Sequence, residues 1–159
     1  MVMIMELIRR AEEKDINDIL KLLEQVNLVH YLGRPDIFKP NTKYNYDELV
    51  KIINNNDKVI FVYEMDNKVV GYCFTVKIQH LNDNLLTDIK TLYIDDLCVD
   101  KEYRGNHIGE SLYKYVLSYA KEQDYYNIEL NVWELNKGAK AFYKKLGLTP
   151  LKTTLEQKI

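Results

Sequence analysis

The sequence predicts an α/β or α+β fold, in which helices pack on the faces of one mixed β-sheet. Strand-like apolar runs precede, separate and follow amphipathic helical runs, an order typical of such layered folds. The 159 residues suit one domain, spanning residues 1–159, and a hydrophobic content of 47% can fill its core. No linker or internal repeat is visible along the chain.

One short strand and two helices are predicted in the first third of the chain. Leu7–Arg9 begins the strand, and Asp15 is placed to cap the helix that follows. The apolar residues of that helix fall on one face: Ile16, Ile19, Leu20, Leu23 and Val26. The second helix is predicted over Tyr46–Asn55.

A hairpin and a further strand are predicted in the middle of the chain. The runs Lys58–Glu64 and Lys68–Ile78 are rich in β-branched and aromatic residues, and the intervening Met65-Asp66-Asn67 is typical of a hairpin turn. Thr91–Val99 is predicted to be the next strand.

The last third again alternates between helix and strand. An apolar face predicts a helix over His107–Glu122: Ile108, Leu112, Tyr115, Val116, Tyr119 and Ala120. Ile128–Trp133 is a predicted strand, and Asn136 can cap a helix that runs through Leu146 and ends at Gly147. Thr153–Lys158 is predicted to be the last strand.

Composition and charge disfavour several classes of function. The formal net charge is −2, and acidic and basic residues are mixed, so no basic face favours DNA or RNA. The apolar stretch Met1–Met5 is too short for a signal peptide or membrane span, which predicts a cytoplasmic protein. Cys73 and Cys98 lie in strand-like runs, as buried thiols do. No metal site is predicted, because the histidines are scattered: His30, His80 and His107.

The most informative stretch is Leu92–Leu112, where an apolar strand enters a turn that opens a helix. The first amides of a helix lack intrahelical partners and carry partial positive charge, which favours a phosphate group there. Gly105 and Gly109 let the backbone approach a ligand closely, and Arg104 adds a positive charge. The spacing fits neither a P-loop nor a dinucleotide fingerprint, so ATP, GTP and NAD are disfavoured. An ordinary tight connection is the alternative interpretation.

Two segments resemble the GNAT family of N-acetyltransferases. Residues 103–109, Tyr-Arg-Gly-Asn-His-Ile-Gly, are similar to the family's Arg/Gln-x-x-Gly-x-Gly/Ala loop, and Asn136–Leu148 is similar to its Asn-x-x-Ala-x-x-Phe-Tyr-x-x-x-Gly-Phe segment. The resemblance implies a GNAT fold, with a mixed, mostly antiparallel sheet of six to seven strands. Its two central parallel strands, here Thr91–Val99 and Asn127–Trp133, are expected to splay around the pantetheine arm of acetyl-CoA.

The same resemblance implies acetyl-CoA as co-substrate. The residues expected to bind it are Leu97, Cys98, Val99, Arg104, Gly105, Asn106, His107, Ile108, Gly109 and Asn136. His107 departs from the family, which has a glycine at this place, and its side chain puts the local φ and the closest approach of phosphate in question. Its imidazole can itself donate a hydrogen bond to phosphate.

A base is useful to an amine acceptor, because freeing an amine of pKa about 10.4 from its proton at neutral pH costs roughly 4–5 kcal/mol. Asp95 interrupts an apolar strand, and strict alternation places it on the face of Tyr93, Leu97 and Val99, with Asp96 facing the other way. The resemblance implies Asp95 as the base, acting through ordered water. An ion pair with a lysine, or a loop cap, is the alternative role.

Tyr143 is the expected general acid. It lies on a different helical face from Phe142, and the resemblance implies that it protonates the leaving thiolate of CoA. The alternative is one more aromatic residue among 13 tyrosines. By the same resemblance, the backbone N–H groups of Leu97 and Val99 hold the acetyl carbonyl and the pantetheine. Asn136 contacts the coenzyme, caps its own helix, or does both.

The predicted function is direct transfer of the acetyl group of acetyl-CoA to a primary amine, with no acyl-enzyme. A non-catalytic acyl-CoA-binding module is the alternative. The family's acceptor site is shaped by the region that here includes Leu28–Phe38, so His30, Tyr31 and Arg34 are candidate substrate-binding residues, although a packed loop also fits. The acceptor can be a small molecule, a polyamine, an antibiotic or a protein. No membrane partner is expected, and an edge strand near the C-terminus suggests a homodimer.

Overall fold

The computed structural model describes residues 3–159, so Met1 and Val2 of the apolar N-terminal stretch lie outside it. Its sheet has five strands in the order of the sequence: β1 (Glu6–Arg10), β2 (Lys58–Met65), β3 (Lys68–Gln79), β4 (Lys90–Val99) and β5 (Asn127–Leu130). The first four strands pair antiparallel, and β4 and β5 pair parallel. The mixed, mostly antiparallel sheet is thus confirmed, with fewer strands than the expected six to seven.

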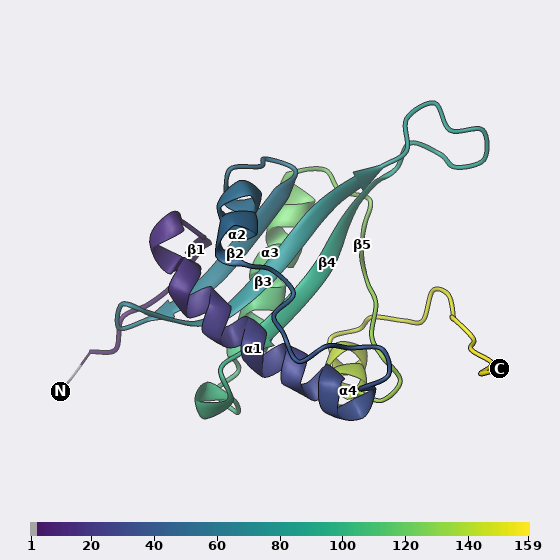
Figure 1. The fold of residues 1–159 in the computed structure, drawn as a ribbon. Helices are drawn as coiled ribbons and strands as arrows, with labels where there is room; N and C mark the ends of the chain where they lie inside the picture. Colours follow the sequence, from purple (N-terminus) through teal and green to yellow (C-terminus); the bar gives the residue numbers. More distant parts are fainter. Residues whose placement is uncertain (1–2) are drawn as a thin grey trace.

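The missing strand is the one predicted over Thr153–Lys158. Within the described residues, the chain after α4 (Lys137–Lys145) forms no strand, and residues 149–159 are exposed. In Figure 1 this yellow segment leaves α4 and extends away from the sheet to the C-terminus. The prediction of a strand there was wrong, because no strand of the described residues lies beside this segment to supply hydrogen bonds.

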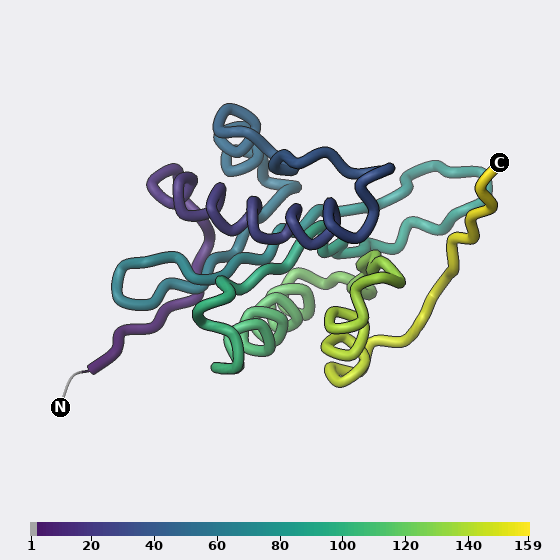
Figure 2. The backbone as a smooth tube through the Cα atoms, turned by 60° about the horizontal axis from the view of Figure 1, so that its bottom comes forward, coloured from purple at the N-terminus to yellow at the C-terminus, as the bar shows by residue number. Residues whose placement is uncertain are grey.

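The helices cover both faces of the sheet. In Figure 2, α1 (Ile16–Gly33) and α2 (Tyr46–Ile53) lie on one side, and α3 (Ile108–Glu122) and α4 lie on the other. The first pair buries a core that includes Ile19, Leu22 and Leu49 against Tyr72 and Phe74 of the sheet. A second core joins α3 to the opposite face through Tyr113, Val116, Ala120, Cys73, Leu92 and Ile94.

Most of the predicted turns and caps are present. Asp66 and Asn67 have φ values of 50° and 65°, the left-handed pair expected in a two-residue hairpin turn. The Asn136 side chain accepts from the Ala139 amide at 3.1 Å and so caps α4. Asp15, however, does not cap α1 with its side chain. Its carboxylate accepts from the Arg9 guanidinium at 2.7 and 2.8 Å and from the Glu12 amide at 2.8 Å, where it ties β1 to the 3-10 turn η1 (Glu13–Asp15).

The parallel pair β4 and β5 stays together for four positions only. Their register runs from Thr91 opposite Asn127 to Ile94 opposite Leu130. Beyond that point β4 continues to Val99, whereas β5 ends at Leu130, three residues before the predicted Trp133. The two strands therefore separate as expected, and the second half of β4 has no strand beside it on the β5 side.

Candidate active site

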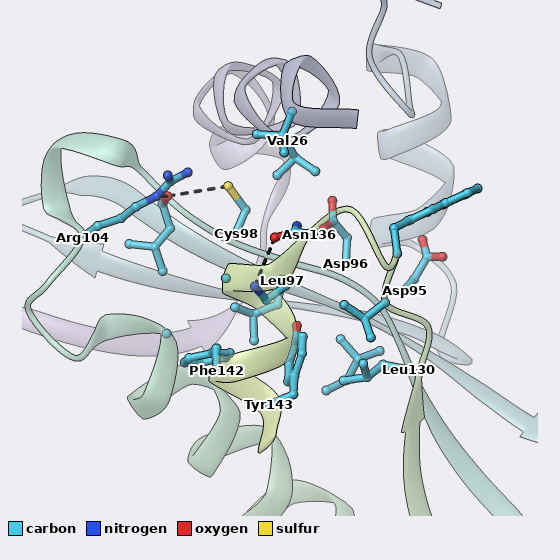
Figure 3. Close-up of a pocket in the computed structure, with 18 of the residues that line it drawn as sticks. Val26, Asp95, Asp96, Leu97, Cys98, Arg104, Leu130, Asn136, Phe142 and Tyr143 are labelled. Carbon is cyan, nitrogen blue, oxygen red and sulfur yellow. Dashed lines mark hydrogen bonds between the residues drawn. The ribbon is translucent and has the colours of Figure 1, made fainter. Parts of the chain in front are cut away.

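The separated strands border a large pocket. Its volume is about 970 Å³, and it is lined by β4, the end of β5, the C-terminal half of α1 and the first turns of α3 and α4. In Figure 3, Arg104 and Asp95 lie at opposite ends of the pocket, with Tyr143 between them. The pocket therefore has an arginine end, a middle and a carboxylate end.

At the arginine end the chain turns into α3 through two left-handed residues. Gly105 has φ +86°, with open space where a Cβ would stand, and His107 has φ +60°. The first intrahelical bond of this turn runs from the Ser111 amide to the His107 carbonyl, so the amides of residues 108–110 lack such a partner. This is an anion-binding geometry, and Arg104 adds a charge beside it.

His107 adopts the backbone conformation that a glycine would have at this place. Its ring Nδ1 lies 3.3 Å from Glu110 Oε2, and Glu110 is also paired with Lys114 at 2.9 Å. Those two partners hold the pKa of Glu110 below its usual value, with Lys114 the larger cause. The one carboxylate in the first turn of α3 is thus paired with Lys114 and His107, which leaves the helix start suited to a phosphate.

Of the residues expected to bind the coenzyme, nearly all line this pocket: Leu97, Cys98, Val99, Arg104, Gly105, His107, Ile108, Gly109 and Asn136. Asn106 does not line it, and its side chain instead donates to the Tyr103 carbonyl at 3.0 Å. Gly109 packs against α4, because a Cβ there would stand 3.3 Å from Phe142 Cζ. Any side chain at residue 109 would therefore push into the junction of α3 and α4.

The middle of the pocket presents backbone groups of β4 and one phenol. The Asp100 amide bonds to the Val70 carbonyl in β3, so by alternation Leu97 and Val99 direct their backbone groups away from β3, into the gap beside β5. Consistent with this direction, the Val99 carbonyl accepts from Arg104 Nε at 3.2 Å. Figure 3 shows the Tyr143 hydroxyl pointing from α4 towards this part of β4. Burial raises the pKa of Tyr143, which keeps its proton in place at neutral pH.

At the carboxylate end a β-bulge overturns the expected directions of Asp95 and Asp96. Phe74 pairs with Asp96 but Thr75 pairs with Ile94, so Asp95 is the extra residue in β4. Both carboxylates consequently lie on the α1 and α2 side of the sheet. Each one accepts a hydrogen bond at 2.6 Å from a tyrosine packed against Phe74: Asp95 from Tyr44 and Asp96 from Tyr72. The prediction that Asp96 faces away from Asp95 was wrong, because alternation fails across a bulge.

The two carboxylates nevertheless differ in environment. Asp95 also pairs with Lys43, whose Nζ lies 2.9 Å from Asp95 Oδ1, and its side chain is 17% exposed. Asp96 lies deeper, and burial raises its pKa in spite of the hydrogen bond from Tyr72. Both aspartates line the pocket, Asp95 with the more exposed carboxylate.

An aromatic wall borders the carboxylate end. His30 stacks on Phe38 with ring centroids 5.0 Å apart, and Phe38 meets Trp133 edge-on at 5.1 Å. Burial, with a smaller contribution from Lys43, lowers the pKa of His30, so its ring is neutral at pH 7. Of the three candidate substrate residues only His30 lines the pocket. Tyr31 lies outside it, as does Arg34, which is paired with Asp36 and Glu156 at 2.8 and 2.9 Å.

Five residues of this end were not among the sequence candidates: Phe38, Lys43, Tyr44, Tyr72 and Trp133. Trp133 is the chain's single tryptophan, and it ends the predicted strand Ile128–Trp133, so sequence reasoning could have singled it out. Lys43 and Tyr44 lie between α1 and α2, where no periodicity marks them. They contact Asp95 across about fifty positions of sequence, a distance that spacing arguments do not cover.

The described residues contain neither a metal-binding cluster nor a membrane-spanning helix. Within residues 3–159, no group of three or more His, Cys, Asp or Glu side chains is arranged to hold a metal ion. No helix in that range has both the length and the apolar character needed to cross a membrane.

Comparison with known proteins gives consistent matches. The sequence matches the acetyltransferase (GNAT) family over residues 26–148. A putative N-acetyltransferase of the alanine of ribosomal protein bS18, from Bacillus subtilis, is 27% identical over 128 residues, which cover 80% of this chain and 77% of that protein. An uncharacterised N-acetyltransferase from Methanocaldococcus jannaschii is 28% identical, and the match covers 88% of this chain but only 59% of that protein. Among solved structures, a mutant of the BH1408 protein from Bacillus halodurans is similar with a TM-score of 0.92 at 32% identity, covering 96% of this chain and 99% of that one.

Proposed function

Because the chain belongs to the acetyltransferase (GNAT) family, we propose that it transfers the acetyl group of acetyl-CoA to a primary amine. The observation that carries this proposal is the order of groups along one pocket. An anion-binding helix start, free backbone groups of β4, a buried phenol and two carboxylates follow one another from end to end. Coenzyme and acceptor then approach from opposite ends and meet at β4.

The coenzyme supplies an acetyl thioester, and the arginine end of the pocket is suited to its pyrophosphate. The amides at the start of α3 and the Arg104 guanidinium bind phosphate oxygens, and the left-handed turn at residues 105–107 keeps the backbone close. The amides of Leu97 and Val99 orient the pantetheine and the acetyl carbonyl. As the carbonyl oxygen gains charge during attack, such fixed donors stabilise it.

The carboxylate end receives the acceptor and removes its proton. An ammonium group pairs well with Asp95, which then accepts a proton directly or through water as the neutral amine attacks. Tyr44 holds one oxygen of Asp95 at 2.6 Å and so fixes the carboxylate for this role. Asp96 is the second candidate base, since its raised pKa favours proton uptake.

Tyr143 gives its proton to the thiolate that leaves. A thiolate is a modest leaving group, with a thiol pKa of about 8.5, so protonation assists its departure. Transfer without an acyl-enzyme is supported by the protonation of Cys98, the cysteine that lines the pocket. Burial, with a smaller contribution from Asp96, raises the pKa of Cys98 to about 12, so Cys98 is not a thiolate nucleophile at neutral pH.

The test is release of CoA thiol from acetyl-CoA across a panel of primary amines, with Tyr143→Phe beside wild type. We expect kcat to fall by about 10²-fold in the variant, and the alkaline limb of its pH profile to change. Tyr115→Phe is the matched control, because Tyr115 is a half-exposed phenol of α3 outside the pocket. An unchanged kcat and an unchanged pH profile in Tyr143→Phe would contradict the role of Tyr143 as the general acid. Calorimetric CoA binding without turnover on any amine would favour the non-catalytic binding module.

A further inference from the structure

Lys43 holds its amine against the carboxylate end of the pocket. Its Nζ lies 2.9 Å from Asp95 Oδ1 and 3.3 Å from the Asp95 carbonyl oxygen, and Lys43 itself lines the pocket. The amine is therefore bonded to the same carboxylate that an acceptor amine would use. Its side chain is 44% exposed, so it is also open to the space where the acceptor binds.

The neighbouring residue fixes this arrangement. Tyr44 donates to the other oxygen of Asp95 at 2.6 Å, and its ring stacks on Phe74 with centroids 5.6 Å apart. The backbone that carries Lys43 is thus anchored to the sheet one residue away from the amine. Such anchoring keeps the amine near Asp95 at a high effective concentration, which an external amine reaches only at high substrate levels.

We propose that Lys43 is itself an acceptor, and that the enzyme acetylates this residue within the same molecule when no better amine is present. The inference rests on the proposed function, because it needs acetyl-CoA bound in the pocket. Asp95 takes one proton from the Lys43 ammonium and passes it to solvent. The neutral nitrogen forms a bond to the acetyl carbon as the carbon–sulfur bond breaks. Tyr143 supplies the proton that converts the thiolate to CoA thiol, and the second nitrogen proton, lost to solvent, is balanced by one that solvent returns to the Tyr143 phenolate.

Acetylation of Lys43 would change the acceptor end. The amide product carries no charge and cannot form the ion pair with Asp95. The acetylated side chain would also occupy space beside the position of an incoming amine. The modified enzyme is therefore expected to turn over external amines more slowly, and saturating external amine is expected to protect Lys43.

A second lysine of the same chain provides a matched control. Lys140 has a similar exposed fraction, 42% against 44%, and a similar ion pair, with Nζ 2.7 Å from Glu134. Lys140 lies outside the pocket and its carboxylate partner is itself exposed. Non-enzymatic acetylation by acetyl-CoA affects both lysines alike, whereas the proposed reaction affects Lys43 alone.

The experiment incubates the full chain with acetyl-CoA and no added amine, and follows each lysine by peptide mass spectrometry. We expect acetylation at Lys43 to be at least about 100-fold faster than at Lys140, with a rate per molecule that is independent of protein concentration. In Asp95→Asn the rate at Lys43 is expected to fall by about 10²-fold while the rate at Lys140 stays the same. Lys43→Arg keeps a cation beside Asp95, and its whole-protein mass is expected to lack one acetyl group.

Equal rates at Lys43 and Lys140, or a rate at Lys43 that Asp95→Asn leaves unchanged, would overturn the proposal. CoA binding measured by calorimetry and turnover on the amine panel separate this result from a failure of the proposed function. If both are present and Lys43 stays unmodified, only the self-acetylation is wrong. If CoA does not bind the wild type, the proposed function itself is wrong, and the self-acetylation falls with it.

Discussion

At the scale of single residues, His107 combines a strained backbone with a position at the start of the anion site. A side chain in the left-handed region costs about 1–2 kcal/mol relative to glycine, and a β-branched one is disfavoured further. We expect His107→Val to lower the free energy of unfolding by about 1 kcal/mol or more relative to His107→Gly, measured by urea denaturation. Both variants lack the imidazole, so the difference between their unfolding free energies reports the cost of the left-handed backbone at residue 107. Equal stability of the two variants would show that residue 107 carries no such strain.

Asp96 makes the stability of the protein depend on pH. Burial raises its pKa in the folded state, so the folded protein holds this proton more tightly than the unfolded chain does. The contribution is therefore fully present below the usual carboxyl pKa and is lost as the pH rises through the raised one. Asp96→Asn removes that loss and keeps an oxygen for the Tyr72 hydroxyl.

We therefore expect the unfolding free energy of Asp96→Asn, relative to wild type, to be higher at pH 7.5 than at pH 4.5. Urea denaturation at the two pH values measures the difference, and the other titrating groups cancel between variant and wild type. A relative stability that is constant, or that increases towards low pH, would contradict the assignment.

At the scale of elements, the first strand is clamped to the start of α1 by an ion pair. Arg9 contacts both oxygens of Asp15, and it reaches Glu64 of β2 at 3.4 Å. The Asp15 side chain is only 6% exposed, so the pair is well shielded from water. Burial opposes ionisation of Asp15, but the bonds from Arg9 and the Glu12 amide outweigh it and lower the pKa of Asp15.

We expect Asp15→Asn to lower the free energy of unfolding by about 2 kcal/mol at pH 7, because charged hydrogen bonds of this kind contribute about 1.5–3 kcal/mol. The loss is expected to shrink as the pH falls below the usual carboxyl range, where the wild-type carboxylate is protonated as well. Lys14→Gln is the control, since Lys14 and Glu12 are both more than half exposed and 3.6 Å apart. Such surface pairs contribute about 0–1 kcal/mol. Equal effects of the two changes would contradict the clamp.

The elements differ in how far the sequence predicts them. Helix faces, the Asp66-Asn67 turn and the Asn136 cap act within a few residues, so local patterns predict them. The bulge at Asp95 depends on the register between β3 and β4, which no local pattern contains. The same limit applies to the candidate site. Arg104, Gly109 and Tyr143 follow from motifs, whereas Lys43 and Tyr44 reach Asp95 only through the tertiary fold.

At the scale of the whole molecule, the C-terminal segment was predicted to be a strand but pairs with no strand among residues 3–159. In an extended segment Leu151, Leu155 and Ile159 fall on one side, and Leu151 and Leu155 are 70% and 89% exposed. Two ion pairs tie the segment to the body, Glu156 with Arg34 at 2.9 Å and Lys158 with Asp36 at 4.0 Å. In the described sheet β5 is an edge strand, paired only with β4. The open edge of β5 can pair with the C-terminal segment of a second copy, so the two copies can exchange these segments and form a dimer.

Light scattering on the full chain is accordingly expected to give the mass of a homodimer. Leu155→Glu places a charge on the apolar side of the segment and is expected to give the monomer mass. Thr154→Glu is the matched control on the opposite side, where a charge remains in solvent, and it is expected to leave the dimer intact. A monomer mass for the unmodified chain at high concentration would defeat the prediction.

The separation of β4 from β5 has a consequence for hydrogen exchange. Over residues 96–99 one side of β4 pairs with β3 and the other side meets no described strand. The Cys98 amide, which faces β3, should therefore exchange slowly, while those of Leu97 and Val99 exchange rapidly in the free protein. A coenzyme lying in the gap takes the place of the missing strand and slows exchange at Leu97 and Val99 alone. Alternate amides of a single strand thus report on occupancy of the pocket, independently of any chemical turnover.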